Sequence, residues 1–200
     1  MCQDWGKREG GALTKILIAY GTSEGHTARI AQYLADVIRG QGHETYAVDV
    51  QRAKAGEPDG YDGVIVGASV HMGRHERWVA DYVRQNRDTL ERLPSAFFSV
   101  SLAARDNTDE ARKEVDGYIE KFVQQTGWRP RTVGRFAGAL LYTRYGFFKR
   151  WIMRKIARDK GSTDIDTSRD YVYTDWHGVR RFAEEFLEIL IPEGVHSARG

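Results

Sequence analysis

KILIAYGTSEGHTARIAQYLADVIRG, residues 15–40, joins a short apolar segment to an amphipathic one through a loop of glycine and hydroxyl residues. Residues 15–20 are mostly apolar and stop at Gly21, which is typical of a strand buried on both faces of a sheet. From Ala28 onward, apolar residues recur at helical spacing until Gly40 and Gly42. The stretch therefore predicts a strand, a glycine-containing loop and a helix in succession.

The rest of the chain repeats this alternation. Further strands are predicted at residues 43–50, 61–69, 95–104 and 132–142, and further helices at 76–93, 108–127 and 174–190. Thr108 is expected to cap one of these helices, and Thr174 or Asp175 the last. Such alternation predicts an α/β fold, a doubly wound five-stranded parallel sheet of order 2-1-3-4-5. Ligands of this fold bind at the carboxyl ends of the strands, so the loops after strands one, three and four should form the site.

Composition sets the class of protein. The chain has 200 residues, of which 41% are apolar and 29% charged, as in an ordinary globular protein. The single cysteine, Cys2, excludes an internal disulfide and fits a reducing, cytoplasmic compartment. No apolar run approaches the roughly 20 residues that span a bilayer. We expect a flexible leader at residues 1–14, one domain at 15–191 and a flexible tail at 192–200.

The loop after the first predicted strand has the composition of an anion site. Thr22, Ser23 and Thr27 supply hydroxyls, and Gly25 allows the backbone to approach a ligand closely. The following helix would direct its free N–H groups and positive dipole end at the same point, which suits a phosphate monoester. The loop is neither a Walker loop nor a G-x-G-x-x-G turn. The alternative is a strand-to-helix turn in which Gly and Thr serve only as caps.

This Thr-x-x-Gly-x-Thr loop resembles the FMN-phosphate loop of the flavodoxins. The residues concerned are Thr22, Ser23, Glu24, Gly25, His26 and Thr27. The resemblance implies that the loop after the third strand, residues 67–76, packs on the isoalloxazine ring through Ala68, Ser69, Val70, His71 and Gly73. With only His71, Met72 and small residues there, a ring face would stay open to a bulky partner. The alternative for His71 and His75 is a solvated loop pair, and no metal site is expected.

The loop after the fourth strand, residues 97–106, would then meet the polar edge of the flavin. The residues that the resemblance places there are Ser99, Val100, Ser101, Leu102, Ala103 and Arg105. Arg105 would neutralise the reduced flavin or a substrate carboxylate. Equally, it would pair with Asp106 or Asp109 and have no such role.

A more specific resemblance covers nearly the whole chain after residue 14. The chain is similar to the flavodoxin-type, menaquinone-dependent protoporphyrinogen IX dehydrogenases in residues 61–83, 93–106, 128–156 and 171–186. These dehydrogenases have a basic-aromatic insertion after the fifth strand and a Tyr-Thr-Asp-Trp start to the last helix. The resemblance implies FMN-dependent oxidation of protoporphyrinogen IX in haem biosynthesis, with a membrane quinone (menaquinone or ubiquinone) as acceptor. It implies a cytoplasmic protein that is peripheral on the inner face of the cell membrane. A homo-oligomer is left open. No side chain is assigned as catalytic, and His71 is a weak candidate for a base.

The predicted insertion, about residues 142–170, is both apolar and basic. Within residues 144–161, seven cationic residues face one anionic residue, in a chain whose net charge is only +2. The candidate substrate or membrane residues are Arg144, Tyr145, Phe148, Lys149, Arg150, Trp151 and Arg154. Such a segment suits an anionic membrane surface, the porphyrin's propionates and macrocycle, or a helix that merely covers the sheet edge. Nucleic acid is not expected, because the rest of the chain adds no comparable basic face.

Two other functions remain open at this point. A flavodoxin-like electron carrier would use the same fold, although docking faces of such carriers are usually acidic. A quinone reductase would use FMN without a porphyrin.

Overall fold

A computed structural model describes residues 13–52, 57–140 and 171–190 of the chain. The five strands of its parallel sheet are β2 (Glu44–Asp49), β1 (Lys15–Gly21), β3 (Gly63–His71), β5 (Ser95–Ser101) and β6 (Thr132–Ala137), in that spatial order. Numbered along the chain without the short β4 (Arg74–His75), this is the predicted order 2-1-3-4-5, which is confirmed. Ile18 of β1 lies between Ala47 of β2 and Ile65 of β3, so β1 is a central strand.

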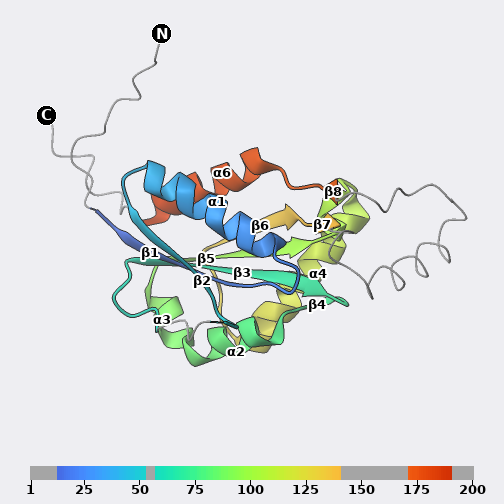
Figure 1. Cartoon of the computed structure of the whole chain (residues 1–200). Coiled ribbons are helices and arrows are strands. Elements are labelled where there is room, and N and C mark those ends of the chain that lie inside the picture. The colour runs from blue at the N-terminus through green and yellow to red at the C-terminus, as the bar shows by residue number, and fades with distance from the viewer. Residues whose placement is uncertain (1–12, 53–56, 141–170, 191–200) are drawn as a thin grey trace, which may run out of the picture.

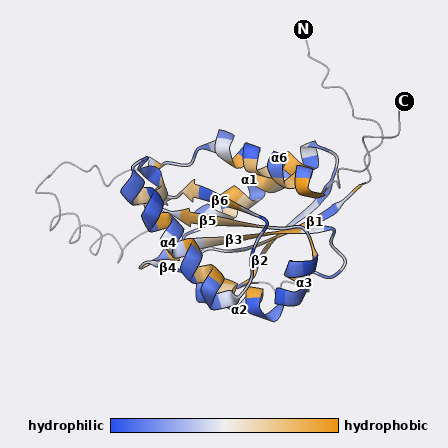
Figure 2. Cartoon of the chain, turned by 180° about the vertical axis from the view of Figure 1, so that it is seen from behind, coloured by the Kyte–Doolittle hydropathy of each residue, from blue (hydrophilic) through white to orange (hydrophobic). Residues whose placement is uncertain are grey.

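Helices cover both faces of the sheet (Figure 1). Helices α1 (His26–Gly40) and α6 (Trp176–Leu190) lie on one face, and α2 (Arg77–Gln85), α3 (Arg87–Arg92) and α4 (Asp109–Thr126) lie on the other. Apolar residues line the strands and the inner sides of the helices, while polar residues face outward (Figure 2). This arrangement leaves the carboxyl ends of the strands and their loops together at one edge of the sheet.

Neighbouring residues of β5 supply the two halves of the core. Phe98 packs on the α1–α6 side and Phe97 on the opposite side, where its ring stacks on Phe122 with centroids 4.6 Å apart. Burying each of these rings contributes about 1.5–3 kcal/mol. The Phe98 ring lies over Gly67 of β3, where an added Cβ would meet the ring at 2.0 Å. Successive side chains of β5 therefore point to opposite faces of the sheet, so one set packs under α1 and α6 and the other set packs against the helices of the opposite face.

Several local expectations need correction. The predicted helix 76–93 is two helices, because the backbone turns at Asn86, whose side-chain amide donates to the Tyr82 carbonyl at 2.9 Å. The predicted strand 132–142 leaves the sheet at Gly138, after which β7 (Ala139–Leu140) pairs antiparallel with β8 (Tyr171–Val172). A 3-10 turn, η1 (Ala103–Arg105), replaces the end of the predicted strand 95–104.

Both capping predictions are resolved. The Thr108 hydroxyl accepts the Ala111 N–H at 3.2 Å, which confirms it as the cap of α4. At α6, Asp175 is the capping residue, since its carboxylate accepts the His177 N–H at 3.0 Å. Predictions for the leader through residue 12, for the insertion after residue 140 and for the tail lie outside the described residues.

Candidate functional site

The loop between β1 and α1 is held in a tight turn by its own threonine. The Gly25 N–H donates to Thr22 Oγ1 at 2.8 Å, and Gly25 adopts a left-handed conformation with φ of 89°. Helix α1 then begins without a side-chain cap and without an acidic residue in its first turn. Its first N–H groups therefore lack an intrahelical acceptor and carry the positive end of the helix dipole.

Among the buried polar atoms that have no hydrogen-bond partner in the described residues, two beside this loop are able to donate. They are Thr27 Oγ1, in a side chain that is only 1% exposed, and Trp78 Nε1. Trp78 reaches the loop from α2, because a Cβ added to Gly21 would lie 2.7 Å from Trp78 Nε1 and 2.3 Å from Val79 Cγ2. A buried donor without an acceptor costs about 1–3 kcal/mol. The uncapped helix and these orphan groups fit a ligand that brings several acceptor oxygens, as a phosphate does.

The His26 side chain was predicted to line this loop, but it contacts Thr174, the residue two positions before α6. It is buried, and its Nε2 lies 2.6 Å from the Thr174 hydroxyl, which itself donates to the Ala137 carbonyl at 2.7 Å. Since that hydroxyl proton is in use, Nε2 is the protonated nitrogen. Burial, and then Arg29, lower the pKa of His26 to about 4. The neutral ring thus ties α1 to the lead-in of α6, and its backbone N–H remains in the first turn of α1.

A second group of side chains gathers around Glu76, the residue before α2. Glu76 is 7% exposed, and its Oε1 accepts hydrogen bonds from Ser23 Oγ at 2.5 Å and Ser69 Oγ at 3.2 Å. His71 Nε2 lies 3.6 Å from the same Oε1 and 3.7 Å from Glu24 Oε1. The carboxylate therefore joins the β1–α1 loop to the end of β3.

Beyond His71 the chain makes a hairpin. Met72 has φ of 49° and Gly73 has φ of 77°, and His71 and Val70 pair with β4 on the return. Met72 is 87% exposed, so its own side chain extends into solvent and does not pack over the loop. Ala68 precedes the loop and is buried in the sheet.

His75 is not the solvated partner of His71 that the sequence allowed, so that alternative is wrong for this residue. Its Nε2 lies 2.9 Å from Ser99 Oγ, and its ring packs edge-on against Phe97 and Phe122. Burial lowers the pKa of His75 to about 4, opposed in part by a hydrogen bond with the Tyr118 backbone. The neutral His75 ring is therefore partly buried against the core and fixes the base of the hairpin.

The residues at the end of β5 and in the loop that follows lie in different surroundings. The Ser99 side chain is fully buried against His75, and Val100 is buried in the α1–α6 half of the core, so neither side chain lies in the loop cluster. Ser101 Oγ accepts the Ala104 N–H at 3.3 Å, which shapes the turn into η1. Leu102 is exposed, and Ala103 begins η1.

Arg105 takes the pairing that the sequence offered as its alternative role. Its guanidinium donates to both oxygens of Asp106, at 2.9 and 3.2 Å, and lies 5.1 Å from the ring centroid of Tyr173. The hydrogen bonds from Arg105 to Asp106 raise its pKa, so it stays cationic. Arg105 thus places a fixed positive charge beside the lead-in of α6.

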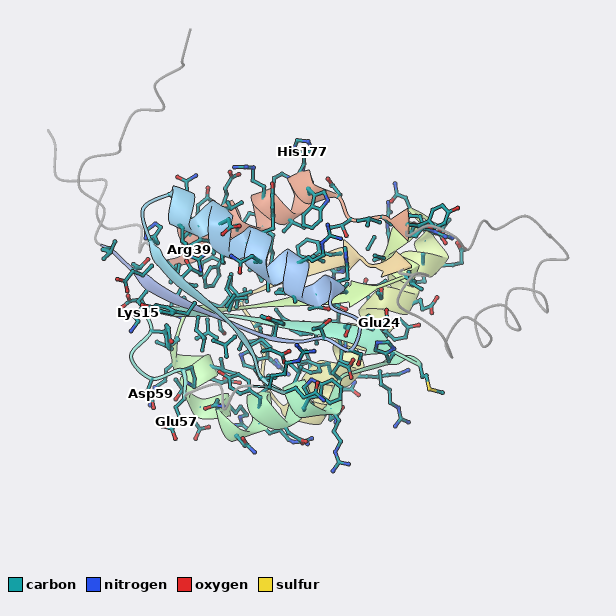
Figure 3. All side chains as sticks on the ribbon, in the orientation of Figure 1. Lys15, Glu24, Arg39, Glu57, Asp59 and His177 are labelled. Atoms are coloured by element: carbon teal, nitrogen blue, oxygen red, sulfur yellow. The ribbon has the colours of Figure 1, made fainter. Side chains whose placement is uncertain are left out.

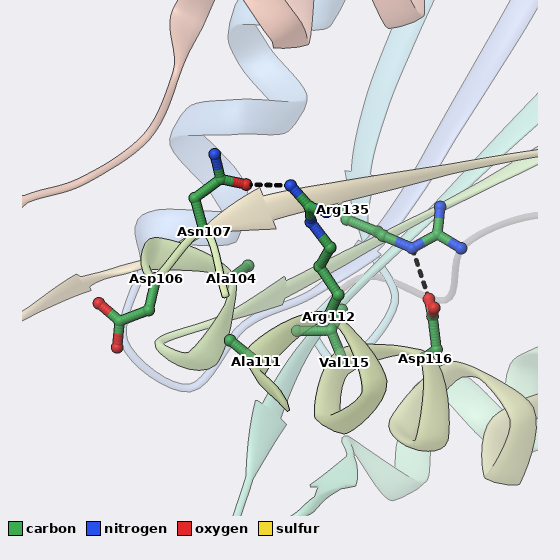
Figure 4. Close-up of a pocket in the computed structure, with 8 residues that line it drawn as sticks. All are labelled: Ala104, Asp106, Asn107, Ala111, Arg112, Val115, Asp116 and Arg135. Carbon is green, nitrogen blue, oxygen red and sulfur yellow. Dashed lines mark hydrogen bonds and ion pairs between the residues drawn. The ribbon is translucent and has the colours of Figure 1, made fainter. Parts of the chain in front are cut away.

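A hollow of about 460 Å³ lies beside this loop, between η1, the start of α4 and β6 (Figure 4). Its lining residues are Ala104, Asp106, Asn107, Ala111, Arg112, Val115, Asp116 and Arg135. Its two arginines are engaged, Arg135 with Asp116 at 2.6 Å and Arg112 with Asn107 at 2.5 Å. The hollow is therefore lined by both acidic and basic side chains, Asp106 and Asp116 together with Arg112 and Arg135.

Sequence reasoning missed four residues that organise the site: Glu76, Trp78, Thr174 and Trp176. Glu76 and Trp78 flank the start of α2, and a buried charge there gives no periodic signal. Trp176 packs on Tyr33, with ring centroids 5.0 Å apart, and edge-on against His26. Thr174 and Trp176 belong to the Tyr-Thr-Asp-Trp segment, whose family association was visible in the sequence although its contacts were not.

Two further searches covered the described part of the chain only. In residues 13–52, 57–140 and 171–190, no cluster of three or more His, Cys, Asp or Glu side chains is arranged to hold a metal ion. Within the same ranges, no helix combines the length and apolar character needed to cross a membrane.

Solved structures with the same architecture are flavodoxins. The chain aligns with oxidised flavodoxin 1 from Bacillus cereus at 17% identity and a TM-score of 0.51, covering 88% of this chain and 98% of that one. It aligns with a short-chain flavodoxin associated with a bacterial microcompartment at 10% identity and a TM-score of 0.54, covering 90% and 100%. The fold thus defines a flavodoxin-like protein.

Sequence comparison narrows this class. Residues 17–166 match the profile of the Flavodoxin domain family. The protoporphyrinogen IX dehydrogenase (quinone) of Leishmania major is 38% identical over 184 residues, covering 89% of this chain and 78% of the relative. The enzyme of that name from Escherichia coli K12 is 34% identical over 175 residues, covering 88% and 96%. The chain belongs to this family of flavodoxin-type protoporphyrinogen IX dehydrogenases, and it is an oxidoreductase with a flavin cofactor.

Proposed function

We propose that the protein oxidises protoporphyrinogen IX to protoporphyrin IX in haem biosynthesis, using FMN and passing the electrons to a membrane quinone. The observation that carries the proposal is the 34–38% identity to two dehydrogenases of this name over most of both chains. Bound FMN would supply the two-electron chemistry, and the protein would bind, orient and screen it.

Features of the β1–α1 loop support FMN as the particular flavin. A phosphate monoester would meet the uncapped N–H groups of α1 and the orphan Thr27 hydroxyl. Riboflavin has no phosphate and would leave these donors unpaired. The proposed phosphate contacts are therefore Thr22, Ser23, Gly25 and Thr27, together with the backbone of Glu24 and His26.

The remaining contacts follow from the same placement. The ring would lie between residues 68–73, at the end of β3 and in the following turn, and residues 101–105, at the end of β5 and in η1, with Ser99 and Val100 acting from within the core. Arg105 would favour an anionic group at this edge, either on the flavin or on a substrate carboxylate. The exposed Met72 is consistent with a ring face that a large macrocycle can approach.

For the basic insertion we propose contact with the substrate or with an anionic membrane surface. Its residues Arg144, Tyr145, Phe148, Lys149, Arg150, Trp151 and Arg154 lie outside the described part of the chain, so composition alone supports this. Residues 15–191 would form one domain that carries the insertion, and the protein would act at the cytoplasmic face of the membrane.

The direct test follows the flavin itself. FMN-loaded protein mixed anaerobically with protoporphyrinogen should lose its visible flavin absorbance, and added quinone should restore it. Absorbance that stays constant with protoporphyrinogen but falls with a general reductant would favour an electron carrier or a quinone reductase. A variant that lacks residues 144–166 should still bind FMN and should fail to oxidise protoporphyrinogen; full activity would refute the role given to the insertion.

A further inference from the structure

Three titratable side chains from separate parts of the chain converge beside the proposed flavin site. Glu24 comes from the β1–α1 loop, His71 from the end of β3 and Glu76 from the residue before α2. His71 Nε2 lies 3.7 Å from the first carboxylate and 3.6 Å from the second. Figure 3 shows Glu24 at the edge of the sheet where the strand-following loops gather.

Glu76 is the fixed member of this group. Its side chain is only 7% exposed, and hydrogen bonds from Ser23 and Ser69 hold its Oε1. A buried carboxylate is costly unless a cation or enough donors accompany it. His71 is the side chain that could supply that cation after accepting a proton, because its Nε2 lies 3.6 Å from Glu76 Oε1.

His71 is the reachable member. Its side chain is 29% exposed and that of Glu24 is 23% exposed, so both border solvent and any ligand that lies on the loop. Arg74 stands opposite His71 in the β3–β4 ladder and is the cation nearest in register. Among the described residues, the charged groups placed beside the imidazole include the carboxylates of Glu24 and Glu76 and the side chain of Arg74.

We propose that His71 accepts the proton released in each two-electron oxidation of the porphyrinogen, with Glu76 and Glu24 stabilising the imidazolium. This rests on the proposed function. In each step the substrate loses two electrons with one hydrogen to the flavin, and a second hydrogen leaves as a proton to the imidazole. His71 would then release that proton to water, and the quinone would take two electrons with one hydrogen from the flavin and one proton from water to become the quinol, so atoms and charge balance.

The decisive variant is His71→Gln, which keeps a polar side chain of similar reach and cannot accept a proton. We expect anaerobic flavin reduction by protoporphyrinogen to slow roughly 10²-fold or more, in line with the loss of a general base. The rise of that rate with pH in the parent protein should be absent in the variant. FMN affinity, read from quenching of flavin fluorescence, should stay within about threefold. His177→Gln is the matched control, because His177 lies on the outer side of α6 (Figure 3) and its rate should be unchanged.

Glu76→Gln separates charge from structure. The amide oxygen can still accept from Ser23 and Ser69, while the charge that favours the imidazolium is lost, so the rate should fall by about tenfold. His71→Gln protein that binds FMN normally and reduces it within about twofold of the parent rate would overturn the proposal, as would an unchanged pH dependence. A parent protein that binds FMN but is not reduced by protoporphyrinogen would instead refute the proposed function, which keeps the two failures distinct.

Discussion

The partly buried imidazole of His75 makes the stability of this protein depend on pH in a way that one substitution can isolate. Its pKa is lowered from 6.5 to about 4, chiefly by burial against Phe97 and Phe122. His75 therefore binds a proton below about pH 6.5 in the unfolded chain, but only below about pH 4 in the folded chain. The contribution of neutral His75 is fully present above pH 6.5 and is lost progressively as the pH falls toward 4.

The size of the effect follows from the shift. Each pKa unit corresponds to about 1.4 kcal/mol, so the full difference is about 3 kcal/mol, most of it realised by about pH 4.5. Glutamine at position 75 does not titrate. The free energy of unfolding falls in both proteins when the pH is lowered from 7 to about 4.5. This decrease should be about 2–3 kcal/mol smaller in His75→Gln than in the parent protein. Urea unfolding at both pH values measures this difference.

The comparison between two proteins cancels the carboxylates that titrate in the same range. His26, whose pKa is also lowered to about 4, remains in the variant and keeps part of the pH dependence. Equal losses of stability in the parent and in His75→Gln would refute the conclusion that His75 is neutral in the folded protein.

Three further substitutions test the loop contacts. Gly21→Ala should destabilise the protein by about 1–3 kcal/mol, because the added Cβ would overlap Val79 and Trp78. Gly40→Ala is the control and should not destabilise the protein, because its added Cβ meets nothing within 4 Å. Thermal unfolding measures both variants. Thr174→Val should cost about 2 kcal/mol, since it leaves His26 Nε2 and the Ala137 carbonyl unpaired, and a change below about 0.5 kcal/mol would argue against that link. Trp78→Phe should leave the stability of the FMN-free protein nearly unchanged and weaken FMN binding about fivefold, measured by fluorescence titration, if the orphan indole N–H meets the ligand.

Periodicity was enough to predict the order of the sheet and the helices that cover it. The apolar run at residues 15–20 and the helical spacing after Ala28 report which faces are buried, and burial is what fixes these elements. The capping role of Thr108 could also be predicted, because its hydroxyl bonds to a backbone N–H only three residues further along the chain. These signals are local, so one sequence contains them.

The contacts within the site were not readable in the same way. Glu76 meets Ser23 across 53 positions of the chain, and His26 meets Thr174 across 148, so neither contact leaves a local pattern. The surroundings of the Ser99 side chain were not readable for a different reason. One step along β5 moves a side chain to the other face of the sheet, and the sequence did not show which face of this fully buried strand meets His75.

The most direct measurement of the central claim is porphyrin fluorescence in an anaerobic assay that contains the FMN-loaded protein and protoporphyrinogen, with and without menaquinone. The account predicts sustained appearance of porphyrin only when menaquinone is present, with three quinones reduced for each porphyrin formed, because six electrons leave in pairs. A yellow, FMN-loaded protein that forms no porphyrin with either menaquinone or ubiquinone would contradict it.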